Sequence, residues 1–144
     1  MHRSDTVKLL RECNAGCKNA TDNMGLVLSR VKDKELRRLI REYNKEHVAI
    51  GDACHAALDR LGSREKDPVH AVIMMAKAGS AMQLSMDNRS ETAASIMHRG
   101  CSIGIRSLSR YLNEYGNANE ESRRLAEDLI ELEDSFERDL RRFL

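Results

Sequence analysis

The sequence has little aromatic content, no tryptophan and a single proline. Aromatic residues make up 3% of the 144 positions, whereas proteins that bind single-stranded nucleic acids stack bases on exposed aromatic rings. That class of function is therefore not expected. One proline and eight glycines leave few residues that would interrupt a helix. The scarcity of both residue types predicts long helices.

The sequence also lacks an excess of charge of one sign. Lysine and arginine (24 residues) are balanced by aspartate and glutamate (23 residues), and the net charge is +1. Such a surface is not expected to attract nucleic acid or an anionic membrane. No apolar run follows Met1–Asp5, so a cytoplasmic protein with reduced cysteines is predicted. The length suits one domain over residues 1–144.

Apolar residues recur at alternating spacings of three and four along almost the whole chain. The predicted inward seam of the first helix begins with Val7 and Leu10, and that of the last helix includes Leu129, Leu132 and Phe136. This period is typical of helices that bury one face in a bundle. Asp33 lies in the first expected turn, and Gly62 is placed to end the second helix. The pattern predicts four long helices over about 5–31, 35–61, 90–115 and 119–143, and a shorter one over 68–86.

Short turns join the first two long helices and the last two. Each pair is therefore predicted to form an antiparallel hairpin. The helix at 68–86 is long enough to carry the chain from one end of the bundle to the other. The expected fold is all-α, a ferritin-like four-helix bundle with a helical crossover. A plain up-and-down array of five helices is the alternative topology.

Three stretches of sequence resemble a small bacterial ferritin-like family of unknown function. They are Leu36–Tyr43, the helix end Leu58-x-x-Leu61-Gly62, and Met97–Ser102. The resemblance extends from about Val7 to Leu144 and implies the four-helix bundle. It brings no catalytic motif with it.

Ferritin-like di-iron proteins use a Glu from each of two helices and a Glu-x-x-His from each of the other two. The second helix here offers Asn44-x-x-His47, which keeps the His and lacks the Glu, and the last helix offers Asp134-x-x-Glu137. Two iron ions need several inward carboxylates. Neither di-iron oxidase nor ferroxidase activity is therefore expected, and no catalytic residue is assigned.

A soft-metal site is the alternative use of the core. When the expected helices are aligned at the turns that connect them, Cys17, His47 and Cys101 fall in one central layer of the bundle. Thiolate and imidazole are ligands of zinc and cuprous copper. The residues that could support such a site are Cys13, Cys54, Met24 and Met97. The simpler interpretation is a closed core without a cofactor, in which Cys fills space and His47 hydrogen-bonds a hydroxyl such as that of Thr21.

The segment 68–86 is apolar on every side and contains one charged residue, Lys77. A helix that covers one face of a monomer should carry charge on the other. We therefore expect this segment to bind a second copy of the chain or another protein partner, although packing inside the bundle would also cover it. The predicted interface residues are Val72, Met74, Met75, Met82 and Met86. The predicted function is protein–protein association as a homodimer without catalysis. The alternative is a soft-metal-binding or thiol-responsive protein.

Overall fold

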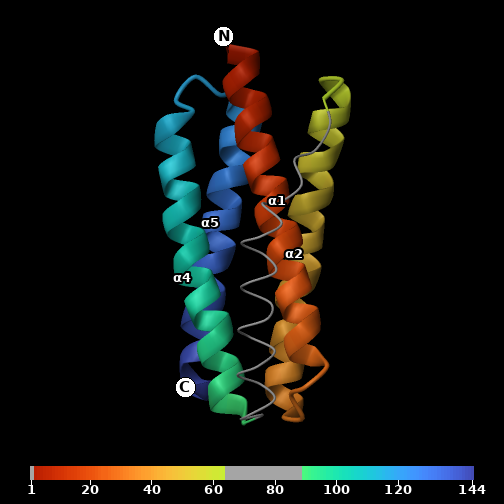
Figure 1. Cartoon of the computed structure of the whole chain (residues 1–144), viewed down its shortest axis with the longest axis vertical. Coiled ribbons are helices and arrows are strands. Elements are labelled where there is room, and N and C mark those ends of the chain that lie inside the picture. Colours follow the sequence, from red (N-terminus) through yellow and green to blue (C-terminus); the bar gives the residue numbers. More distant parts are fainter. Residues whose placement is uncertain (1, 64–88) are drawn as a thin grey trace.

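The computed structural model describes residues 2–63 and 89–144. Four α-helices lie side by side along one long axis (Figure 1). They are α1 (His2–Leu28), α2 (Lys34–Arg60), α4 (Ser90–Glu114) and α5 (Glu120–Leu140), and a 3-10 turn, η1 (Arg141–Phe143), follows α5. The four long helices predicted from the sequence are confirmed, with ends within about three residues of those expected. The helix predicted over 68–86 lies outside the described residues.

Local sequence explains where the helices begin and end. The Asp33 side chain caps α2 by accepting a hydrogen bond from the Leu36 N–H at 2.8 Å, and Asn119 caps α5 in the same way. Gly62 ends α2 with φ of 65°, a conformation that favours glycine. Arg37 donates to the Leu28 carbonyl and, at 2.8 Å, to the Val31 carbonyl. This side chain satisfies acceptors at the end of α1.

The helices form two antiparallel hairpins, α1 with α2 and α4 with α5, which pack against each other. In Figure 1, α2 ends at the end of the bundle opposite to the one where α4 begins, so these two helices run parallel. In addition, α1 contacts α4 and α2 contacts α5. The four helices thus close a bundle on themselves, as the bundle prediction requires and a linear array does not. None of the helices within residues 2–63 and 89–144 is long and apolar enough to cross a membrane.

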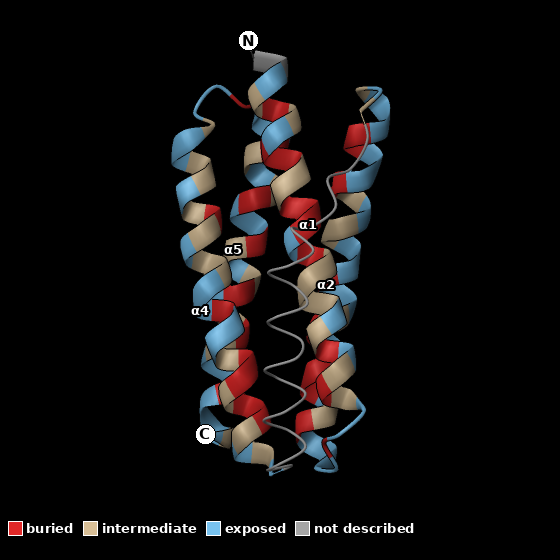
Figure 2. Cartoon of the chain, in the orientation of Figure 1, coloured by how far each residue is buried: buried red, intermediate tan, exposed pale blue. Residues whose placement is uncertain are grey.

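The buried residues point inward from all four helices (Figure 2). They form two apolar clusters, one nearer each end of the bundle. One contains Met24, Ile40, Met97 and Phe136, and the other contains Leu10, Cys54, Leu108 and Leu129. On both α2 and α5 a buried polar residue lies between the two clusters, His47 on α2 and Glu133 on α5.

The predicted inward positions were wrong in two helices. In α1 the buried stripe is wider than the predicted seam and includes Leu9 and Val27, while Val7 is only half-buried. In α5 the inward residue of the middle turn is Glu133 and not Leu132. The physical reason in α1 is that this helix contacts three others, so a band of side chains wider than one seam is covered. In α5 the buried position of Glu133 depends on its bond to His47, and Leu132 beside it is half-buried.

Candidate functional site

A buried pair formed by a base and an acid, His47 and Glu133, lies at the centre of the bundle. His47 has no exposed surface and Glu133 is 7% exposed. The His47 Nε2 lies 2.5 Å from Glu133 Oε1, and its Nδ1 lies 2.7 Å from the Tyr43 carbonyl oxygen. Both ring nitrogens therefore have a partner, and α2 is bonded to α5 at mid-height.

The partners of His47 determine where its protons lie. A backbone carbonyl can only accept, so Nδ1 carries a hydrogen and donates it to Tyr43. At Nε2 one proton is shared with the Glu133 carboxyl, either as an imidazolium beside a carboxylate or as a neutral imidazole beside a carboxylic acid. The pair has no net charge in either form. This neutrality is what allows two ionisable groups to be buried together.

Glu133 also interacts with two of the four cysteines. Burial raises the pKa of the Cys101 thiol, and the charge of Glu133 and a side-chain hydrogen bond to Glu133 raise it further. Burial likewise raises the pKa of Cys17, followed by the charges of Cys54 and Glu133. The Gly104 backbone lies beside the Glu133 carboxyl, where an added Cβ would be 3.6 Å from it. Glu133 is therefore enclosed by groups from three helices.

The remaining two cysteines meet between α1 and α2. A side-chain hydrogen bond with Cys54 is the largest cause that raises the pKa of Cys13, and burial is the second. One turn away the helices approach closely, because a Cβ added at Gly51 would lie 3.2 Å from the Cys17 Cβ. All four cysteines are buried and free. A buried thiol of raised pKa is unreactive, because the thiolate is the nucleophile.

A second hydrogen bond joins α2 and α5 one turn from the central pair. The Tyr43 hydroxyl donates to Asp139 Oδ2 at 2.5 Å, and the Tyr43 ring stacks on Phe136 with centroids 4.4 Å apart. Burial raises the pKa of Tyr43, and the bond to Asp139 adds to that shift. Tyr43 also provides the carbonyl that holds His47. Its position therefore fixes the orientation of the imidazole.

The structure places the predicted metal ligands in the core but does not gather them into a site. Cys17, His47 and Cys101 are all buried, as are Cys13, Cys54, Met24 and Met97. Within residues 2–63 and 89–144, no group of three His, Cys, Asp or Glu side chains is placed to hold a metal ion. The arrangement gives the soft-metal prediction no support. The predicted interface residues, Val72, Met74, Met75, Met82 and Met86, lie outside the described residues.

Glu133 is the residue that sequence reasoning missed. The partner expected for His47, a hydroxyl such as that of Thr21, is wrong, because Thr21 donates to the Lys18 carbonyl at 3.0 Å. The signal was present in α5, whose buried residues alternate spacings of four and three through position 133. They are Ser122, Ala126, Leu129, Glu133, Phe136 and Leu140. A seam drawn through the apolar Leu132 conceals this pattern.

The acidic pair expected nearest the di-iron positions, Asp134 and Glu137, does not enter the core. Asp134 forms an exposed ion pair with Arg138 at 3.1 Å. Glu137 is half-buried between α5 and α4, 3.6 Å from His98 Nε2, and accepts a hydrogen bond from Ser102 at 3.1 Å. Both carboxylates are thus engaged by residues outside the central layer.

A crystal structure of a DUF305 fragment from Deinococcus radiodurans matches this protein with a TM-score of 0.74, covering 94% of this chain and 92% of that chain. The two chains share a fold. Their sequences are 18% identical, so the DUF305-like similarity concerns the fold alone. No family model and no curated protein matches the sequence.

Proposed function

We propose that this protein is a non-catalytic helical bundle that acts by binding protein, and that it forms a homodimer. The observation that carries the proposal is the closed central layer. His47 has both ring nitrogens engaged, and Glu133 is bonded to it at 2.5 Å. The imidazole and the carboxyl group of this core are therefore bonded to each other.

The surroundings of the pair support the absence of a reaction site. An acid, base or nucleophile must reach its substrate within hydrogen-bond distance. Here Cys17 and Cys101 are buried and their pKa values are raised by that burial. An open depression lies on the α2–α5 surface, lined by Ala53, Leu125 and three charged side chains. It is separate from the central layer and contains none of its residues.

The ferritin-like assignment is part of this proposal. It is supported by the two packed hairpins and by the positions of the central residues. α2 has Asn44-x-x-His47, with the His of the di-iron pattern and no Glu, while α5 has Glu133-x-x-Phe136, with the Glu and no His. The other two helices contribute Cys17 and Cys101 to this level. One imidazole and one carboxylate of such a pattern then remain, and they pair with each other.

The association is supported by the sequence of 68–86, which contains Lys77 as its one Asp, Glu, Lys or Arg residue. The four described helices already bury a core of their own. A segment that is apolar on every side has more apolar surface than one contact can cover. We place the protein in the cytoplasm, in keeping with its four free cysteines.

Multi-angle light scattering over a range of micromolar concentrations tests the proposal. A dimer of the 144-residue chain is expected. The double variant Met74→Lys/Met75→Lys should weaken it if 68–86 is the contact. A matched control is Ile103→Lys, because Ile103 lies on α4 and is 61% exposed. A monomer at every concentration, with no partner bound, would overturn the proposed function.

A further inference from the structure

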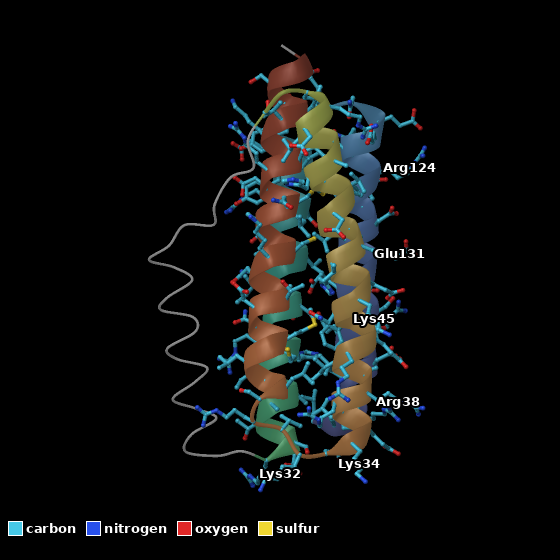
Figure 3. All side chains as sticks on the ribbon, turned by 90° about the vertical axis from the view of Figure 1, so that its right-hand side faces the viewer. Lys32, Lys34, Arg38, Lys45, Arg124 and Glu131 are labelled. Atoms are coloured by element: carbon cyan, nitrogen blue, oxygen red, sulfur yellow. The ribbon has the colours of Figure 1, made fainter. Side chains whose placement is uncertain are left out.

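Three of the four cysteines lie together between α1 and α2. Cys13, Cys17 and Cys54 belong to the same apolar cluster, and none of them is more than 2% exposed. The two helices run side by side along most of their length (Figure 1 and Figure 3). Their contact therefore brings together thiols from two distant parts of the sequence.

The register of the two helices places Cys13 opposite Cys54. A Cβ added at Gly51 would lie 3.2 Å from the Cys17 Cβ and 3.9 Å from its Sγ, so these two positions face each other at close range. Because the helices are antiparallel, one turn along this contact leads from Cys17 back to Cys13. The same turn leads from Gly51 on to Cys54. The two thiols meet there, and a side-chain hydrogen bond joins them.

The other possible pairs of thiols are less well placed for a covalent bond. Cys13 and Cys17 are four residues apart on one helix, where Cβ atoms lie about 5–6 Å apart, whereas the Cβ atoms of a disulfide lie about 3.5–4.5 Å apart. Cys54 raises the pKa of Cys17 through its charge and not through a hydrogen bond. Cys101 lies on α4, where its side chain is hydrogen-bonded to Glu133. Cys13 and Cys54 are thus the pair that is both on facing helices and in direct contact.

We propose that Cys13 and Cys54 form a disulfide that locks α1 to α2 in an oxidised form of the folded protein. The inference goes beyond the association proposed above and does not depend on it. The oxidant is a low-molecular-weight disulfide of the glutathione class. Each protein thiol loses one proton and one electron, a bond forms between the two sulfurs, and the S–S bond of the oxidant breaks to give two small thiols.

The route to this bond passes through the opened chain. Cys13 and Cys54 are 0% exposed in the folded bundle, and the thiolate is the species that attacks a disulfide. A thiolate of the unfolded chain therefore forms the mixed disulfide first. The second cysteine displaces the small thiol when α1 and α2 pack together. The product closes a loop over residues 13–54, which restricts the unfolded chain and stabilises the folded one. Burial then protects the bond from reduction.

Refolding of the reduced chain in a glutathione redox buffer tests which pair forms. After free thiols are alkylated, peptide mass spectrometry without reduction identifies the bridges. The Cys13–Cys54 bridge should exceed every other intramolecular bridge by about ten-fold or more, since the other pairs require backbone movement to bond. The matched control is the same oxidation in concentrated urea, where loop-closure entropy favours the short Cys13–Cys17 loop. A change of the preferred pair between the two conditions shows that the fold selects it.

Urea unfolding of oxidised and reduced protein provides a second measurement. The oxidised native chain should keep its helical circular dichroism and unfold at a higher urea concentration than the reduced chain. Cys17→Ala and Cys101→Ala retain the pair and should show the same upward shift on oxidation, whereas Cys54→Ala should show none. Each variant is compared with its own reduced form, so the packing that is lost with the side chain cancels.

A predominant bridge that involves Cys17 or Cys101, or no intramolecular bridge at all, would overturn this inference. An oxidised protein less stable than the reduced one would do the same, because the bond would then distort the contact between α1 and α2. Neither result bears on the proposed homodimer, which light scattering of the reduced protein tests by itself.

Discussion

At the scale of single residues, the bundle is organised around a group that could not be buried alone. An isolated carboxylate or imidazolium in an apolar core is strongly unfavourable, whereas a bonded pair with no net charge is tolerated. Glu133 is 7% exposed because His47 lies 2.5 Å from it. Two apolar clusters lie on either side of this pair. It therefore also specifies which turn of α5 faces which turn of α2.

Removal of either member should be more harmful than removal of both. Glu133→Leu leaves the His47 Nε2 without its acceptor in the core, and a loss of about 3–5 kcal/mol is expected. His47→Leu should cost a similar amount. The double variant His47→Leu/Glu133→Leu replaces the pair by apolar contacts, and it should recover at least about 1 kcal/mol relative to additivity.

Urea unfolding followed by circular dichroism measures these differences. Glu127→Leu is the matched control, since this carboxylate is exposed on the same helix and should change stability by less than about 0.5 kcal/mol. Strictly additive losses in the double variant would show that the two side chains are not coupled.

The cysteines give the protein a defined response to alkaline pH. Burial raises the pKa of Cys17 and of Cys101 above the ordinary value of 9.0. Between 9 and the folded value, the unfolded chain has lost thiol protons that the folded chain retains. Stability from this source is therefore complete below pH 9 and declines as the pH rises further. Each thiol contributes a slope of about 1.4 kcal/mol per pH unit.

The free energy of unfolding measured between pH 8 and pH 11 should accordingly fall more steeply in the native protein than in Cys101→Ala. The slopes of the free energy of unfolding against pH are compared, and not its absolute values, because the substitution also removes packing contacts. Lysine and tyrosine titrations are common to both proteins. Equal slopes would mean that Cys101 ionises as readily in the folded state as in the unfolded one.

At the scale of helices, the spacing between α1 and α2 depends on a missing side chain. A Cβ at Gly51 would lie 3.2 Å from the Cys17 Cβ, whereas a Cβ at Gly100 would meet nothing within 4 Å. In a helix interior, Gly→Ala normally gains up to about 1 kcal/mol. Gly100→Ala should show this gain. Gly51→Ala should not, because α1 and α2 must separate slightly.

Thermal or urea unfolding of the two alanine variants, made in the same protein, tests this difference directly. The two substitutions are chemically identical, so propensity cancels in the comparison. An equal gain at both positions would show that α1 can shift without loss of packing.

The sequence predicted α2 better than α5, and the reason is physical. In α2 the inward positions are apolar or aromatic except for His47, so period and hydrophobicity agree. In α5 the inward position of the middle turn is occupied by Glu133, and the adjacent Leu132 is the more apolar choice. The hydrophobicity of a side chain describes its transfer out of water by itself. The burial of Glu133 depends instead on His47, which lies 86 positions away in the sequence. A pattern read along one helix does not contain that partner.

At the scale of the whole molecule, the position of the central layer was predicted from the sequence. The bonds between the residues of that layer were not. Cys17, His47 and Cys101 all lie near Glu133, and the short turns fix the register within each hairpin. The bonding within the layer was not accessible in the same way. Whether imidazole and thiols converge on a metal or bond to a carboxylate depends on helix rotation, and rotation is set by packing among all four helices.

The closed layer predicts that the molecule protects its thiols as one unit. All four cysteines lie inside the bundle, at 0–2% exposure, on three different helices. No opening of a single loop would release them, so reaction with an aromatic disulfide reagent should require global unfolding. The four thiols should remain unreactive in native buffer and titrate together across the urea transition.

Zinc in ten-fold excess should leave the thermal midpoint unchanged, since a ligand that binds the folded state would raise it. Rapid reaction of one or two thiols in native buffer, or a midpoint raised by zinc and returned by chelator, would instead favour the soft-metal or thiol-responsive function. Cys54→Ala serves as a control. If the thiols are protected as one unit, this variant should be less stable, yet its three remaining thiols should still become reactive in a single step.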